Sequence, residues 1–96
     1  MSFHFIVRLT PPPENAAAFR EELLRVIERT REEEGCLDIH AFEALRDPIG
    51  FAVHSRFVDE AAFDLHVQLP HTLRFIENGE KLLGKPIQGL RARQIG

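Results

Sequence analysis

Hydrophobic and polar residues alternate along three stretches of the chain, and each stretch is typical of a β-strand with one apolar side. The first stretch covers residues 3–9, and the other two lie within residues 36–57 on either side of a turn at 46–50. Successive side chains of a strand point to opposite faces, so alternation gives each strand a mainly apolar face. A weaker alternation predicts a last strand at about residues 87–93. We therefore expect four strands.

A turn centred near residues 47 and 48 determines which side chains of the second and third strands lie opposite each other. On the mainly apolar face it pairs Leu37 with Phe57, Ile39 with Ser55, Ala41 with Val53 and Glu43 with Phe51. On the other face it pairs Asp38 with Arg56, His40 with His54 and Phe42 with Ala52. A slip of one residue would pair inward with outward side chains, so the chemistry of the two faces favours this register.

The segments between the strands have the spacing of surface helices. Residues 16–34 carry an apolar stripe that should pack on the sheet, while their other face is charged. The stripe consists of Phe19, Leu23, Val26, Ile27 and Thr30. The prolines at 11–13 and Gly35 would mark the start and the end of this helix. Asp59 is a suitable N-cap for a second helix over 60–69, which Pro70 should break before a helical segment that stops at Gly79.

The predicted order of elements is strand, helix, strand, strand, helix, strand over a single domain, residues 1–96. This order is typical of an α+β, ferredoxin-like βαββαβ fold, in which a four-stranded antiparallel sheet is covered by helices on one face. The other face would be left open, although it holds Ile6 and Phe42. A second copy of the chain is the simplest cover for it.

Charge and cysteine content narrow the classes of partner and compartment. A net charge of -3 gives no broad basic field, so we do not expect nucleic acid as a partner. The single Cys36 excludes an internal disulfide and a CxxC metal clip, which is consistent with a reducing compartment. The N-terminus has no signal-peptide pattern, and no apolar run approaches the roughly 20 residues of a membrane span. We expect a cytoplasmic protein that does not bind membranes.

Four short motifs follow one another with characteristic spacing. They are Glu34-Gly35-Cys36-Leu37, Pro48-x-x-Phe51, Asp59-Glu60-x-Ala62-Phe63-x-x-His66 and Pro70-His71-x-x-x-Phe75. In this succession, nearly the whole chain resembles the antibiotic biosynthesis monooxygenase domain of the dimeric α+β barrel superfamily. The resemblance implies a homodimer whose two sheets form a barrel. It also implies a cofactor-independent monooxygenase that uses molecular oxygen and a small aromatic molecule of the quinol or phenol type. A non-catalytic homodimer of the same fold that binds a small ligand is the alternative.

The resemblance implies a substrate pocket between the sheet and the helices. Its walls would be Phe5, Val7, Phe51, Val53 and Phe57, together with Phe3 and Ser55. Apolar walls with a few polar groups suit a flat aromatic molecule. The same residues are equally typical of an ordinary hydrophobic core.

Two histidines match the family motifs and are the candidate catalytic residues. An oxygenase without a cofactor needs a base to convert a phenol into an electron-rich anion, and histidine titrates in the right range. We assign this role to His66, with His71 and Ser55 as orienting groups. Both histidines could instead have structural roles, in which His66 bonds to a neighbouring strand and His71 lies near a helix start.

The sequence departs from the family pattern at two places. Ser55 and Phe57 stand where many members have Glu and, two residues later, Trp, so the pocket should be less polar than usual. Val7 and Ile76 stand where the haem-degrading branch has Asn and His, so we do not expect haem as a cofactor.

The predicted open face of the sheet holds a second group of ionisable residues. His40 and His54 would lie opposite each other beside Asp38, and two imidazoles with a carboxylate are ordinary ligands for zinc or iron. In a dimer, however, such side chains would line the barrel and pair with one another or with water. We therefore assign no metal site and keep this one as an alternative.

Overall fold

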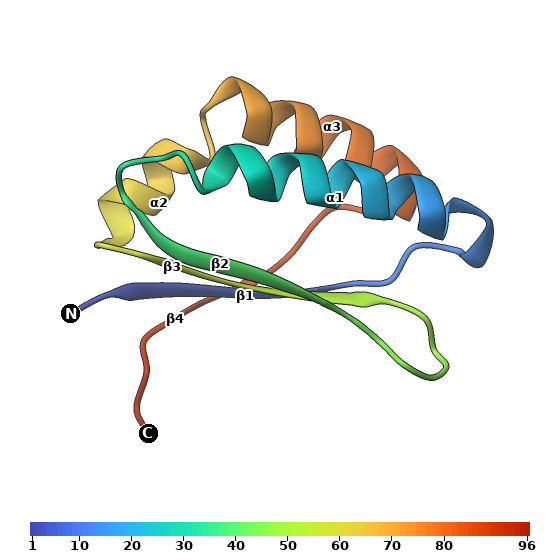
Figure 1. The fold of residues 1–96 in the computed structure, drawn as a ribbon, viewed down its shortest axis with the longest axis horizontal. Coiled ribbons are helices and arrows are strands. Elements are labelled where there is room, and N and C mark those ends of the chain that lie inside the picture. The colour runs from blue at the N-terminus through green and yellow to red at the C-terminus, as the bar shows by residue number, and fades with distance from the viewer.

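The computed structural model describes residues 1–96, and its helices all lie on one face of a four-stranded sheet (Figure 1). The strands are β1 (Phe3–Leu9), β2 (Cys36–Glu43), β3 (Phe51–Phe57) and β4 (Leu90–Ala92). The helices are α1 (Ala16–Thr30), α2 (Glu60–His66) and α3 (Pro70–Leu83), with a short 3-10 turn η1 (Pro13–Asn15) before α1. The strand order β2-β3-β1-β4 is antiparallel throughout, which confirms the ferredoxin-like fold.

The predicted register of the β2–β3 hairpin is confirmed from Asp38 opposite Arg56 through Glu43 opposite Phe51. The prediction at its outer end was wrong, because Cys36 and not Leu37 lies opposite Phe57. The register shifts between Cys36 and Asp38, as it does where a β-bulge inserts one extra residue into a strand. Leu37 is consequently 44% exposed and does not face the helices.

The predicted stripe of α1 is confirmed, because all five of its residues are buried against the sheet and α3. Phe19 is fully buried, and its ring centroid lies 5.7 Å from that of Phe51 and 5.8 Å from that of Phe75. This side chain therefore joins α1 to both β3 and α3.

The end of α1 differs from the prediction, because the helix stops at Thr30 and not at Glu34. The side chain of Thr30 is buried, and its hydroxyl donates to the carbonyl of Val26 at 2.7 Å. Residues 31–35 form turns that carry the chain to β2, so Gly35 is not the helix cap. A Cβ at position 35 would lie 2.7 Å from the Cβ of Ala62, so this glycine lets the turn approach α2 closely.

The second helical region is divided as predicted, but it ends later. The carboxylate of Asp59 caps α2 by accepting from the N–H of Ala62 at 2.8 Å. Pro70 begins α3, which continues through Gly79 to Leu83, so the predicted stop at Gly79 was wrong. Gly79 lies where α3 packs on Phe19, and the chain leaves the helix at Gly84, whose φ of 75° favours glycine.

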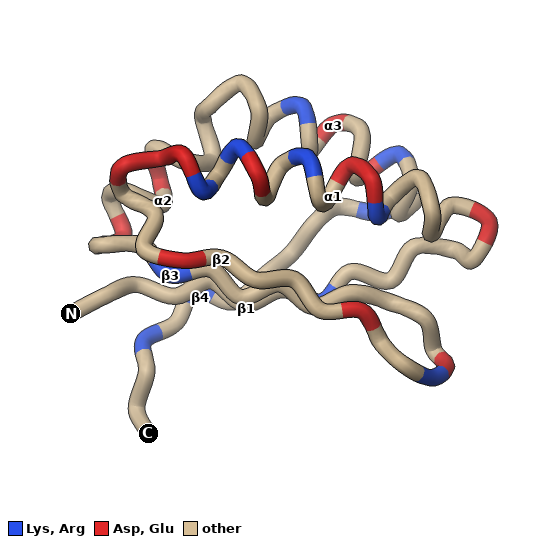
Figure 2. The backbone as a smooth tube through the Cα atoms, in the orientation of Figure 1, with Lys and Arg blue, Asp and Glu red and all other residues tan.

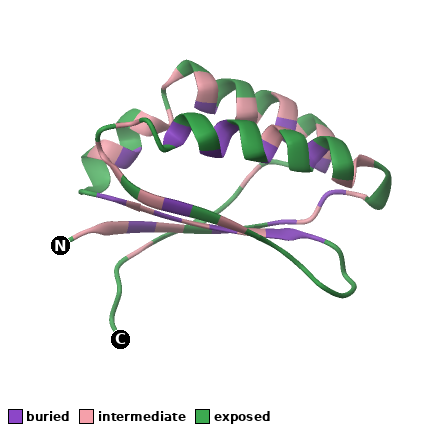
Figure 3. Ribbon diagram, in the orientation of Figure 1, coloured by how far each residue is buried: buried purple, intermediate pink, exposed green.

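The face of the sheet opposite the helices carries no other element of the chain (Figures 1 and 3). Ile6, Phe42 and Leu90 on this face are 43%, 62% and 60% exposed. Strand β4, which borders β1, is shorter than the predicted residues 87–93. None of the helices has the length and apolar character needed to cross a membrane.

Candidate functional site

A cavity of about 200 Å³ lies between the helix-facing side of the sheet and the helices. Thirteen of its eighteen lining residues are hydrophobic, and they come from the sheet, all three helices and the segment before β4. Its polar lining consists of Thr30, Ser55, His66, Thr72 and Glu80. An apolar enclosure with a few polar groups is the usual construction of a small-molecule site.

The structure places four of the residues predicted for the pocket on the wall of this cavity. Phe5, Val7, Val53 and Ser55 line it from β1 and β3. Phe51 and Phe57 lie outside the lining and are 5% and 0% exposed, so they are core side chains behind the wall.

Phe57 nevertheless supports the site from behind. The centroid of its ring lies 5.0 Å from the His66 ring and 5.4 Å from the Phe63 ring. Phe63 and His66 both line the cavity from α2, so Phe57 fixes the position of two lining side chains.

Ser55 offers a hydroxyl to the cavity. The residue is 4% exposed, and its hydroxyl forms no hydrogen bond with another protein group. Every fully buried side-chain nitrogen or oxygen in the structure has a hydrogen-bond partner, so the Ser55 hydroxyl must reach open space in the cavity. It is available to bond a polar group of a ligand.

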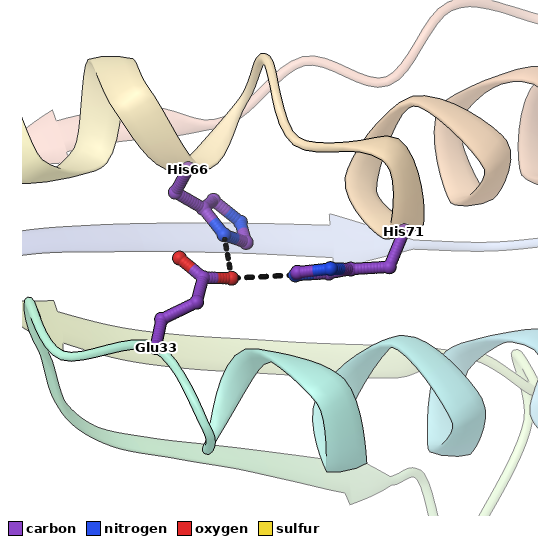
Figure 4. Close-up of side chains that lie close together, drawn as sticks. All are labelled: Glu33, His66 and His71. Carbon is purple, nitrogen blue, oxygen red and sulfur yellow. Dashed lines mark hydrogen bonds and ion pairs between the residues drawn. The ribbon is translucent and has the colours of Figure 1, made fainter.

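The two candidate histidines meet at a carboxylate that sequence reasoning did not identify (Figure 4). Glu33 Oε2 lies 2.8 Å from Nδ1 of His66 and 2.6 Å from Nε2 of His71. The ring centroids of the two histidines are 6.2 Å apart. The side chains of Glu33 and His66 are each 12% exposed and that of His71 is 21% exposed, so this cluster is largely shielded from water.

The break before α3 brings the two histidines to the same carboxylate. His66 is the last residue of α2, and His71 is the second residue of α3. Proline lacks an N–H and forces the residue before it into an extended conformation, which Leu69 adopts with a ψ of 149°. The chain therefore turns between the two helices, and both imidazoles point toward Glu33.

Glu33, the third residue of the cluster, comes from the turn after α1, which lies close to α2. Glu33 belongs to the acidic run that follows α1 and lies beside α2 (Figure 2). Its neighbours Glu32 and Glu34 are exposed. Because Gly35 has no side chain, this turn can lie close to Ala62 of α2, and Glu33 alone of the run points inward.

The carboxylate determines which nitrogen of His66 carries the proton. An ionised carboxylate only accepts hydrogen bonds, so the ring nitrogens that face Glu33 must donate. Neutral His66 then has its proton on Nδ1 and a lone pair on Nε2. The hydrogen bonds of His66 are both at Nδ1, to Glu33 at 2.8 Å and to the Thr72 hydroxyl at 3.4 Å. His66 lines the cavity, so the lone pair on Nε2 can accept a proton from a bound molecule.

Cys36 lies near the site but is not a nucleophile. Burial, followed by the negative charges of Glu33 and Asp38, raises the pKa of its thiol from 9.0 to about 11. The thiol therefore stays protonated at neutral pH and acts as a small apolar side chain.

The alternative site on the open face is arranged differently from the expectation. His54 lies opposite His40 in register, but its Nε2 is 2.8 Å from Nδ1 of His4, and those two rings are stacked. Asp38 accepts two hydrogen bonds from the Arg56 guanidinium, which lowers the pKa of its carboxyl. The proposed ligands thus form separate pairs, and His40 is exposed.

The chain resembles known proteins in its sequence. The sequence profile described as "Antibiotic biosynthesis monooxygenase" matches residues 2–78. The Bacillus subtilis protein named "Putative monooxygenase YcnE" is 29% identical over 79 residues, which cover 82% of this chain and 83% of that protein.

Solved structures share the fold over essentially the full length. Rv0793 from Mycobacterium tuberculosis is 26% identical, with a TM-score of 0.91 over 100% of this chain and 97% of its own. PA3566 from Pseudomonas aeruginosa is 25% identical, with a TM-score of 0.87 over 99% of this chain and 95% of its own.

Proposed function

Because this chain belongs to the antibiotic biosynthesis monooxygenase family, we propose that it is a cofactor-independent monooxygenase that acts on a small phenol or quinol in the cavity. The observation that carries the proposal is the position of His66 on the cavity wall, where Glu33 bonds its Nδ1 and leaves Nε2 free. A carboxylate that orients an imidazole in this way is a common device for general-base catalysis.

The size of the cavity favours a substrate with one aromatic ring. A cavity of about 150 Å³ in a protein core is large enough to hold benzene. The cavity of about 200 Å³ therefore has room for a benzene ring with one or two small substituents. Drug-sized ligands occupy sites of roughly 300–1,000 Å³, so a polycyclic molecule would not fit without rearrangement.

The chemistry begins with proton transfer from a phenol hydroxyl to Nε2 of His66. The phenolate passes one electron to O₂, and the resulting phenoxyl radical and superoxide couple at a ring carbon. The peroxide takes the proton from His66, and its O–O bond then breaks as the ring carbon loses its hydrogen. One phenol and one O₂ give one quinone and one water. The substrate supplies all the electrons, so no external reductant is needed.

The other two candidate residues have supporting roles in this mechanism. The hydroxyl of Ser55 can bond the substrate and orient it, because it reaches the cavity without a protein partner. His71 lies outside the cavity lining and contacts Glu33, so it is a positioning residue for the carboxylate.

Oxygen uptake with a panel of single-ring hydroquinones and phenols tests the proposal. We expect uptake by the wild-type protein and incorporation of one ¹⁸O atom from labelled O₂ into the quinone. His66→Ala should lower the rate by about 10²–10⁴-fold, the usual contribution of a general base. His40→Ala, on the opposite sheet face, is the matched control and should keep the full rate.

Two results would contradict this mechanism. An unchanged rate in His66→Ala would remove the assigned base. Saturable binding of phenols without oxygen uptake would favour the non-catalytic ligand-binding module.

We also propose that the protein is a homodimer that buries the open face of the sheet. The support is the exposure of Ile6, Phe42 and Leu90 on that one face, because exposed large apolar groups on one surface mark interaction sites. Light scattering after size exclusion should give twice the chain mass. Phe42→Lys should shift the protein to monomer, and Leu73→Lys on α3 should not. A wild-type monomer at micromolar concentration would contradict this proposal.

A further inference from the structure

We propose that Glu33, His66 and His71 form a binding site for a divalent transition-metal ion of the zinc type. Each residue offers one ligand atom, and the three atoms lie within 4.8 Å of one another. Two imidazole nitrogens and one carboxylate oxygen are also the protein ligands of open zinc sites, which keep a further position for water.

The three ligands come from segments that can separate slightly to admit an ion. Ligand bonds of about 2.0–2.2 Å around a tetrahedral ion place the ligand atoms roughly 3.4 Å apart. The present separations from Glu33 Oε2 are 2.8 Å to His66 and 2.6 Å to His71. Each ring nitrogen would therefore move away from Oε2 by roughly 0.6–0.8 Å. The two ring nitrogens, which lie within 4.8 Å of each other, would at the same time move toward each other. His66 ends α2 and His71 lies in the first turn of α3, so neither ring is fixed within a strand of the sheet.

Partial exposure gives an ion and its water access to the site. The His71 side chain is 21% exposed, whereas Glu33 and His66 are each 12% exposed. Imidazole ligands select zinc, cobalt, nickel or copper over magnesium and calcium, which prefer an all-oxygen environment. The site should therefore discriminate strongly between Zn²⁺ and Mg²⁺.

Metal binding has a direct consequence for His66. A neutral imidazole that ligates a metal through Nδ1 carries its proton on Nε2, and such a ring donates at Nε2 and cannot accept. The ion would thus occupy the nitrogen that Glu33 now bonds and would remove the lone pair that faces the cavity. This inhibition rests on the proposed function, whereas the binding of the ion does not.

Calorimetric titration of the metal-free protein with Zn²⁺ tests the site itself, and the visible absorption of Co²⁺ reports its coordination. We expect one ion per chain, a four-coordinate cobalt spectrum and no saturable binding of Mg²⁺. Glu33→Gln and His71→Gln should each lower the Zn²⁺ affinity by at least about tenfold, because even the loss of an outer-shell partner has an effect of this size. His40→Gln, an exposed histidine outside the cluster, should leave the affinity unchanged.

Circular dichroism of each metal-free variant checks that the fold is intact. If Glu33→Gln unfolds, the partly exposed His71→Gln still decides the matter. Absence of saturable Zn²⁺ binding would overturn the proposal, and so would equal affinity in wild type and His71→Gln, or a loss of affinity in His40→Gln.

Oxygen uptake measured with and without saturating Zn²⁺ then tests the inhibition. We expect loss of the His66-dependent rate and its recovery after chelation. If Zn²⁺ does not change the rate of oxygen uptake, the proposed inhibition is refuted. The binding of Zn²⁺ is still decided by calorimetry. A protein without oxygenase activity would refute the proposed function alone.

Discussion

Replacement of Gly35 by alanine should destabilise the protein through one contact, that with Ala62. The new Cβ would lie 2.7 Å from the Cβ of Ala62, about 0.7 Å closer than the 3.4 Å at which ordinary contacts begin. Forcing an extra methyl group into a packed site costs about 1–3 kcal/mol. Gly35 does not have a positive φ, so alanine also gains about 0.4–1 kcal/mol from a less flexible unfolded chain. At the middle of both ranges the net loss should be about 1.3 kcal/mol.

The sign of this effect should reverse when Ala62 is replaced by glycine. Ala62→Gly alone should cost up to about 1 kcal/mol, because glycine is a poor helix former. In that background the alanine at position 35 no longer meets a methyl group, and the other atoms near its Cβ lie at ordinary contact distances of 3.8 and 3.9 Å. Gly35→Ala should then stabilise the protein by about 0.4–1 kcal/mol.

Urea unfolding of the four proteins in this cycle, followed by circular dichroism, measures the free energy of unfolding. Gly96→Ala is the control, because nothing lies near the Cβ that it adds, and its stability should match wild type. Independent sites add within about 0.3–0.5 kcal/mol. Additivity of Gly35→Ala and Ala62→Gly would therefore refute the close approach of the turn to α2, and with it our account of how Glu33 is placed.

Three further predictions concern single side chains. Asp59→Ala should cost about 1 kcal/mol and lower Tm by about 4–8 °C, because it removes the 2.8 Å hydrogen bond that caps α2. Asp59→Asn should keep most of the stability. Equal losses in both variants would contradict the capping role. The hydrogen bonds from Arg56 lower the pKa of Asp38 below its ordinary 3.8. The ionised carboxylate therefore stabilises the fold above about pH 4, and this contribution disappears as the pH falls through the lowered pKa. Asp38→Asn should accordingly cost about 0.5–1 kcal/mol at pH 7 in urea titrations, and progressively less as the pH falls through the lowered pKa. A cost that does not change with pH would rule out the ion pair. A pKa of about 11 in place of 9.0 leaves Cys36 with about a hundredfold less thiolate near pH 8. Iodoacetamide should therefore label the folded protein about a hundredfold more slowly than the urea-unfolded chain. Similar labelling rates, measured by mass spectrometry, would contradict the shift.

The sheet could be predicted from the sequence because both faces of its strands have a clear chemical character. Alternation, together with a turn centred near residues 47 and 48, predicted the correct partners from Asp38 opposite Arg56 to Glu43 opposite Phe51. It could not predict the irregularity beside Cys36, because an inserted residue leaves the pattern of the remaining strand intact. Leu37 is apolar and yet exposed, so its chemistry suggested the wrong face.

The helix ends were harder to predict, because local sequence did not decide them. Residues 31–34 are good helix formers, but the chain must leave α1 after Thr30 to reach β2. Gly79 looked like a stop signal, although it is a buried position within α3 that lies against Phe19. In both cases tertiary packing overrode the local preference.

The candidate site was predicted in part. His66 and His71 were identified from motifs, and Ser55 from its place on the wall of the pocket that the resemblance implies. Glu33 was one of three adjacent glutamates with nothing in sequence to distinguish it. Only the turn after α1 directs its side chain inward, and only the break at Pro70 turns both histidines toward it. Such a meeting of three segments depends on the folded chain, so residue spacing cannot reveal it.

Strand β3 is an interior strand whose side chains alternate between the two surfaces of the sheet. Val53 and Ser55 line the cavity, and His54, between them, bonds His4 on the open face. A ligand that displaced the backbone of β3 would move both sets of side chains together. Occupancy of the cavity and association through the open face would then be thermodynamically coupled, and each would change the free energy of the other by the same amount.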